Sequence, residues 1–327
     1  MKLTAMVAAI GIAATSTIAT AEPVNLTLSG GNPGGLWSLL GAGIDRATKA
    51  DDANSVITYQ ATGGGFANIG LLGASRTDLG LVHDAEAKIA LQGGEPFQAP
   101  IENMRAIGYM YNWAPMHFFL TKSVADQYGI DSLDDIATSG APLRIGINRS
   151  GNITSNIALK MLEEAGVTEE SLTAAGGQLV RAGANEQAEL IQDGRLDMIS
   201  NGIFINHSSF RAVNENSEVV LLSIPDAVIA ATNEAFGTGS MVIPAGSYPF
   251  QPGDVPTVTL GALLAATDSL DDATAASLAS SLLKNIDEVR AVHGAMKSLS
   301  PELLATPSVL EFHPGAAEVY KEAGLLK

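Results

Sequence analysis

Three short segments of the chain combine residue types that can bind an anion through backbone amides. They are residues 30–35 (GGNPGG), 62–65 (TGGG) and 148–152 (NRSGN), and each stands directly before a predicted helix. The first amide groups of a helix have no partner within it, and the helix dipole places partial positive charge at the same end. One such segment alone is typical of a helix cap or tight turn. Three at matching places favour a shared anion receptor made largely from backbone.

Side chains in and near these segments complete the predicted site. Hydroxyl and amide groups can donate hydrogen bonds, glycines offer backbone amides, and aromatic rings can enclose a carbon skeleton, although aromatic packing at a hinge is the alternative for the rings. The candidate ligand-binding residues are Asn32, Gly35, Trp37, Thr62, Gly63, Gly64, Tyr111, Arg149, Ser150, Gly151, Asn152, Asn201 and Phe204. Two interpretations of Arg149 stay open: its guanidinium clamps a ligand carboxylate, or it points outward as a solvated charge.

Sequence patterns typical of catalytic and cofactor sites are absent. The chain has no G-x-G-x-x-G after its first predicted strand, no Gly-Lys pair of a phosphate-binding loop, no G-x-S-x-G and no H-E-x-x-H. Its five histidines lack metal-ligand spacing. His83, in residues 83–86 (HDAE), is a candidate metal or acid–base group, but a hydrogen-bonding pocket histidine is the commoner outcome. We expect no catalytic residue, no metal and no cofactor; a secreted hydrolase or lyase is the alternative.

The elements that must position these segments alternate between strand and helix patterns. Each of two sets of strands has helical spacing of apolar residues between its members. The first set is predicted at residues 24–29, 55–60 and 79–82, and the second at 143–147, 179–182 and 196–200. Such β–α–β units require parallel strands, and ligands bind beyond the carboxyl ends of those strands, where the three segments lie.

Two lobes of similar construction explain this repetition. Residues 75–79 (SRTDL) and 194–198 (GRLDM) share a pattern between a helix end and a strand, although helix-to-strand loops commonly look alike. Residues 104–120 and 255–267 are predicted to be long strands that run from one lobe to the other. Helices predicted at 273–285 and 316–326 then return to the first lobe. The predicted domains are residues 22–118 with 258–327, and residues 119–257.

The amino terminus and composition indicate an exported protein. Residues 1–21 combine Met1 and Lys2, an apolar run and the small residues Ala-Thr-Ala, which is typical of a signal peptide cleaved after Ala21. A membrane anchor, the alternative, needs about 20 apolar residues, and this run is shorter. The net charge of −17 makes nucleic acid and anionic membrane surfaces unfavourable partners. Without cysteine the chain has neither disulfides nor a thiol nucleophile.

Several of these motifs together resemble those of the TAXI-type solute receptors of tripartite ATP-independent periplasmic (TRAP) transporters. Residues 62–69 (TGGGFANI) and 77–82 (TDLGLV) are similar to that family's Thr-Gly-Gly helix start and following strand. Residues 31–37 (GNPGGLW) resemble its glycine-rich opening, and residues 243–249 (IPAGSYP) resemble a late motif. The chain differs where it has Arg149 and Asn152 in place of the usual Gly and Thr, and Pro33 and Trp37 in place of a small residue and Tyr.

The resemblance implies an α/β fold of the two-lobe, type II-like periplasmic binding proteins, with each lobe a β-sheet flanked by helices and joined by crossover strands. It implies capture of a small organic anion, such as a dicarboxylate, a 2-oxo acid or an acidic amino acid, and its delivery to the membrane permease subunits of a TRAP transporter. We expect a periplasmic monomer that binds no nucleic acid. A sensor that presents its ligand to a membrane kinase is a further alternative.

Overall fold

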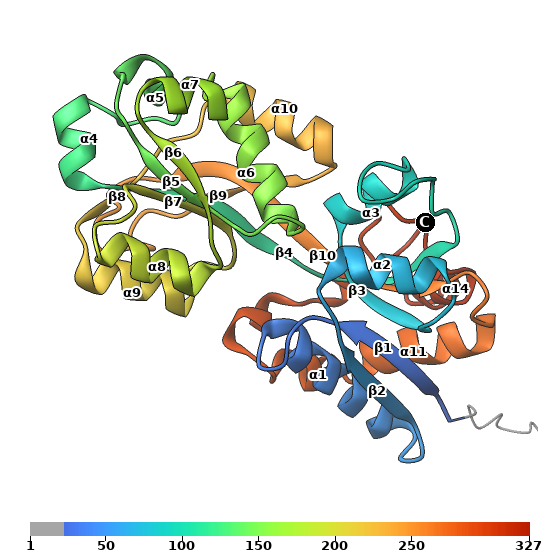
Figure 1. The fold of residues 1–327 in the computed structure, drawn as a ribbon. Helices are drawn as coiled ribbons and strands as arrows, with labels where there is room; N and C mark the ends of the chain where they lie inside the picture. The colour runs from blue at the N-terminus through green and yellow to red at the C-terminus, as the bar shows by residue number, and fades with distance from the viewer. Residues whose placement is uncertain (1–22) are drawn as a thin grey trace, which may run out of the picture.

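The computed structural model describes residues 23–327, so the predicted signal peptide lies outside the described residues (Figure 1). Ten strands are present in this part of the chain: β1 (Asn25–Gly30), β2 (Val56–Ala61), β3 (Leu79–His83), β4 (Met104–Thr121), β5 (Arg144–Ile147), β6 (Gln178–Arg181), β7 (Met198–Gly202), β8 (Val219–Leu221), β9 (Gly239–Ile243) and β10 (Val255–Thr267). The helices are α1 (Leu36–Asp51), α2 (Gly65–Gly73), α3 (Asp84–Leu91), α4 (Lys122–Tyr128), α5 (Asp135–Ser139), α6 (Ile153–Glu164), α7 (Glu169–Ala174), α8 (Ala184–Gln192), α9 (Ser208–Asn216), α10 (Asp226–Phe236), α11 (Asp272–Lys284), α12 (Ile286–Arg290), the 3₁₀ helix η1 (Gly294–Ser298), α13 (Pro301–Leu304) and α14 (Pro314–Glu322).

The strands form two α/β lobes that share their longest members, as predicted. Their order is β2-β1-β3-β10-β4-β7-β5-β6, with β8 paired to β4 and β9 paired to β10. Strands β1, β2 and β3 are parallel, as are β5, β6 and β7, whereas β4 and β10 run antiparallel to their neighbours. Figure 1 shows lobe 1 in blue, cyan and orange and lobe 2 in green and yellow, with β4 and β10 passing between them. No helix of residues 23–327 is both long and apolar enough to span a membrane.

The repeated helix-to-strand pattern has the same structural role in both lobes. The carboxylate of Asp78 accepts the backbone N–H of Thr27, in β1, at 2.7 Å. The carboxylate of Asp197 accepts the backbone N–H of Arg144, in β5, at 2.8 Å. Each aspartate therefore ties the loop before one parallel strand to the start of its neighbour, which is a physical reason for the similar sequences.

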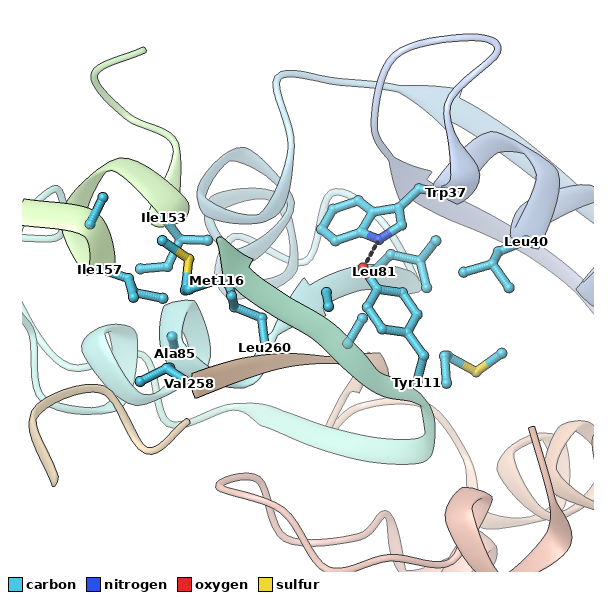
Figure 2. Packing of buried hydrophobic residues seen from close by; sticks show 14 of the residues in the cluster. Trp37, Leu40, Leu81, Ala85, Tyr111, Met116, Ile153, Ile157, Val258 and Leu260 are labelled. Carbon is cyan, nitrogen blue, oxygen red and sulfur yellow. Dashed lines mark hydrogen bonds between the residues drawn. The ribbon is translucent and has the colours of Figure 1, made fainter. Parts of the chain in front are cut away.

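The hydrophobic core runs without interruption from one lobe to the other. Nearly every residue of β10 is buried, and so are most residues of β4, because helices cover both faces of these central strands. Figure 2 shows the packing of lobe 1 side chains around Tyr111 and of Ile153 and Ile157, from α6, beside Met116 and Leu260. The two crossover strands thus tie the lobes together through apolar contacts as well as hydrogen bonds.

The pairing of β4 with β10 is irregular where the strands pass between the lobes. Register shifts occur between Leu260 and Ala262 and again between Ala262 and Leu263. Bulges of this kind bend a strand and increase its twist. The predicted domain boundaries at 118/119 and 257/258 fall inside these continuous strands, and they stay a prediction.

Candidate functional site

A cleft of about 670 Å³ lies between the lobes, beyond the carboxyl ends of their parallel strands. All three predicted anion-binding segments contribute to its lining, from the starts of α1, α2 and α6. The remaining walls come mainly from the junction of β3 and α3, from the crossover strand β4, from the loop after β7 with the first part of α9, and from the segment between α12 and η1. The volume is in the range typical of small-molecule sites.

Most of the candidate residues named from the sequence are brought together in this cleft. Those that line it are Asn32, Gly35, Trp37, Gly63, Gly64, Tyr111, Gly151, Asn152, Asn201 and Phe204. Three candidates do not line it: Thr62, Arg149 and Ser150.

The side chain of Arg149 lies outside the cleft, on the surface of lobe 2. Its Nη2 atom is 3.0 Å from Oε2 of Glu186, in α8, and the two side chains are 70% and 50% exposed. Hydrogen bonding to this guanidinium holds the pKa of Glu186 below its ordinary value. This geometry corresponds to the second interpretation of Arg149, a solvated charge, and provides no carboxylate clamp.

Replacing Arg149 by alanine is therefore expected to change ligand affinity by less than about fivefold, since exposed ion pairs contribute little and are screened by salt. Arg149→Lys is expected to behave in the same way. Calorimetric titration of both variants at low and high salt checks this. A loss of affinity that occurs in both variants and does not depend on salt would return Arg149 to the site.

Thr62 and Asn152 support the cleft through their own segments. The Thr62 hydroxyl contacts the Gly30 carbonyl and the Asn68 side chain, and it accepts the N–H of Gly64 at 3.1 Å. Asn152 caps α6, because its Oδ1 accepts the N–H of Thr154 at 2.9 Å. The helix-cap interpretation thus applies to the Asn152 carbonyl group, while its NH₂ group makes no hydrogen bond within the described residues.

Asn201 presents the most deeply buried unpaired donor at the cleft. It is the last residue but one of β7 and is 1% exposed, and its Oδ1 accepts a hydrogen bond from Nδ2 of Asn148 at 2.9 Å. Its Nδ2 has no partner within residues 23–327. A buried donor without a partner costs about 1–3 kcal/mol, so an acceptor within reach of this amide would stabilise the site.

Glu86 is a cleft residue that the sequence analysis did not select. Its side chain is 4% exposed, and Oε2 accepts both the backbone N–H and Nδ1 of His83 at 3.0 Å. Oε1 has no hydrogen-bond partner among the described residues. The carboxylate lies against Gly65, where an added Cβ atom would be 1.5 Å from Oε2. A ligand anion at the start of α2 would therefore meet a negative side chain.

His83 joins this carboxylate to the aromatic floor of the cleft. Burial alone would lower the pKa of His83, but the charge of Glu86, the hydrogen bond to it and the charge of Asp84 raise the pKa overall. Nε2 lies 3.5 Å from the Tyr111 hydroxyl, which accepts Nε1–H of Trp37 at 3.0 Å (Figure 2). From the sequence, residues 83–86 indicate a candidate functional group in His83 alone. Within residues 23–327 no three His, Asp or Glu side chains are placed to hold a metal ion.

The opposite wall of the cleft carries positive charge. Arg211, in α9, lines the cleft and forms no ion pair with any described residue. Burial and the nearby His293 and Arg211 lower the pKa of His207. The ring of Phe204 lies 5.1 Å from that of His207 and 5.0 Å from that of His293, which belongs to lobe 1. No local motif marks Arg211 or His293, because tertiary packing brings them to the cleft.

The family of the chain follows from a match over nearly all of the described residues. Residues 28–324 match the model of the NMT1-like family. The chain belongs to the NMT1-like family. This family assignment agrees with the prediction of a binding-protein family. It does not distinguish the TAXI type, which stays a prediction.

Solved structures with the same fold include periplasmic binding proteins. MatC from Rhodopseudomonas palustris, with bound malate, has a TM-score of 0.54 and 15% identity, over 85% of this NMT1-like chain and 91% of MatC. A TctC solute-binding protein from Polaromonas has a TM-score of 0.53 and 14% identity, over 83% and 86%. The aliphatic sulphonate binding protein SsuA from Escherichia coli has a TM-score of 0.50 and 12% identity, over 93% and 89%. At such identities the likeness shows the two-lobe fold alone.

Proposed function

We propose that this protein is a periplasmic solute-binding protein that captures a small organic anion between its lobes. The observation that carries the proposal is a cleft in which Arg211, without an ion-pair partner, and the unpaired amide of Asn201 share one lining with three helix-start segments. These groups are donors, and donors in a partly enclosed cleft favour an anionic group of the ligand, held away from Glu86 at the start of α2. The bound malate of MatC and the sulphonate ligands in the name of SsuA support the same class.

Glu86 discriminates among the candidate ligands by the chemical group that each of them carries next to its carboxylate. An ionised carboxylate can only accept hydrogen bonds, so the free Oε1 of Glu86 requires a donor. A second carboxylate or a 2-oxo group offers only acceptors there, whereas an ammonium group offers three donors and a positive charge. Of the three predicted classes, an acidic amino acid fits best, with a carboxylate toward Arg211 and the ammonium group toward Glu86.

Contacts from both lobes give such a ligand a means to stabilise a closed state. Trp37, Gly64 and Glu86 come from lobe 1, and Asn201, Phe204 and Arg211 come from lobe 2. A ligand that contacts both sets binds the closed arrangement more tightly and shifts the population toward it. We propose that the permease subunits of a TRAP transporter recognise this closed monomer and that the protein acts without catalysis.

A thermal-shift screen tests the proposal on full-length mature protein, unfolded and refolded to remove co-purified ligand. Organic acids and amino acids of four to six carbons are compared with sugars and metal salts. A ligand at ~100 times its dissociation constant is expected to stabilise the protein by about 2.7 kcal/mol. Stabilisation by a sugar or a cation with none by any acid contradicts the proposal. Conversion of a bound acid to product, followed by NMR, favours the hydrolase or lyase alternative.

A further inference from the structure

The motif at residues 243–249 supplies no residue to the cleft lining, but one of its side chains reaches the loop that does. Tyr248 is 1% exposed, and its hydroxyl accepts the backbone N–H of Asn206 at 3.3 Å. The same hydroxyl lies 3.0 Å from Nε2 of His117, in β4. The motif therefore reaches the lining loop through the buried hydroxyl of Tyr248, beside apolar packing of Ile243 and Tyr248 with Ile203 and Ile205.

The loop that Tyr248 contacts carries much of the lobe 2 lining. Residues 203–207 connect β7 to α9. The course of this loop determines where Phe204, His207 and the first turn of α9, with Arg211, line the cleft. Asn206 has a φ of 61°, in the left-handed region, which asparagine adopts more readily than most residues with a side chain. A hydrogen bond to its backbone N–H stabilises this conformation further. Within residues 23–327 the Asn206 N–H bonds to the Tyr248 hydroxyl alone.

The position of the Tyr248 hydroxyl is fixed by the packing of its ring. Phe119 contacts the ring edge-on at 5.1 Å between centroids, and Phe250 stacks on it at 5.7 Å. Gln251 links both ends of the turn that contains Tyr248. Its Nε2 donates hydrogen bonds to the carbonyls of Ile243 and Gly253 at 2.9 and 2.8 Å. The hydroxyl thus stands on a closely packed, hydrogen-bonded part of lobe 2.

His117 determines how that hydroxyl is used. His117 is fully buried, and burial lowers its pKa to about 3, so the ring is neutral at physiological pH. Its Nε2 can then accept the Tyr248 proton, which leaves the tyrosine oxygen free to accept the Asn206 N–H. A protonated ring would compete for that oxygen as a second donor.

We propose that Tyr248, oriented by His117, is a positioning residue for ligand binding. It holds the Asn206 backbone in its left-handed conformation and so directs Phe204, His207 and Arg211 into the cleft. The consequence for affinity rests on the proposed function, whereas the anchoring of the loop does not. This gives the 243–249 motif a role that needs no contact with the ligand.

The test compares Tyr248→Phe with Tyr320→Phe in the full mature chain. Tyr320 is an apt control, since it is fully buried, its hydroxyl donates to the Ile107 carbonyl at 2.8 Å, and it does not line the cleft. Amide hydrogen exchange of residues 203–208 is measured without ligand, and affinities for L-aspartate and L-glutamate are measured by calorimetry. Tyr248→Phe is expected to speed exchange of this loop about tenfold and to weaken binding about tenfold, while Tyr320→Phe changes neither.

Each result decides one part of the proposal. Unchanged exchange in Tyr248→Phe overturns the anchor, and faster exchange with wild-type affinity overturns the role in binding. If wild-type protein binds neither amino acid, the proposed ligand class fails, and exchange alone still decides whether Tyr248 holds the loop. Should Tyr248→Phe not fold, His117→Phe keeps an aromatic ring and removes the acceptor of the hydroxyl proton, and the same two measurements apply.

Discussion

Replacing Arg211 by alanine is expected to weaken the binding of organic acids by about 10- to 100-fold. Hydrogen bonds to charged groups contribute roughly 1.5–3 kcal/mol. The guanidinium of Arg211 forms no ion pair with any described residue, so it is available to a ligand carboxylate. Arg211→Lys is expected to recover only part of the loss, because an ammonium group cannot form two parallel hydrogen bonds to a carboxylate. Calorimetry on ligand-free protein measures both effects.

Arg149→Ala is the matched control for Arg211→Ala. Both changes remove one guanidinium from lobe 2, but Arg149 lies outside the cleft and is paired with Glu186. Equal losses in the two variants would mean that only the net charge of lobe 2 matters. Wild-type affinity in Arg211→Ala would remove Arg211 from the site and would leave the helix-start segments as the anion receptor.

Replacing Glu86 by glutamine is expected to reduce strongly the preference of the site for amino acids over the matched organic acids. L-Aspartate, L-malate, oxaloacetate and succinate share a four-carbon skeleton and differ at one carbon, which carries an ammonium, a hydroxyl, a carbonyl oxygen or hydrogen. In wild-type protein the ammonium and hydroxyl compounds are expected to bind more tightly than the other two, since Oε1 of Glu86 accepts a donor. The five-carbon series from L-glutamate tests the same point in a longer ligand.

In Glu86→Gln the advantage of L-aspartate over succinate is expected to fall by about 10-fold or more, as a charged hydrogen bond is lost. Glu186→Gln is the control, because Glu186 is exposed and outside the cleft. Equal affinity for L-aspartate and succinate in wild-type protein would contradict this orientation of the ligand. So would an unchanged ratio in Glu86→Gln.

Local sequence signals predicted the frame of the site well. Strand β10 spans the predicted residues 255–267, and the other predicted strands of both β–α–β units differ from the structure by one or two residues. Glycine-rich segments before helices are visible without tertiary information, because the chain must turn and the helix must begin there. Their convergence followed from the parallel strands that precede them.

The direction of individual side chains could not be predicted in this way. Arg149 stands next to a cleft segment in the sequence, yet Glu186, in α8, holds its guanidinium at the surface. His293 reaches the cleft from the other lobe, and Tyr248 acts on it through the backbone of Asn206. Each of these positions depends on a partner distant in the sequence, which periodicity and motif spacing do not reveal.

The place of β10 in the sheet also sets the order in which the two lobes can be completed. Residues 255–267 lie between β3 and β4, so the sheet of lobe 1 has a missing central strand until the last quarter of the chain has been synthesised. Strands β5, β6 and β7 of lobe 2 need no residue beyond Gly202 to pair with one another and with β4. Closing such a long-range gap is slow relative to local pairing. The lobe that is begun first on the ribosome is therefore the one that is finished last.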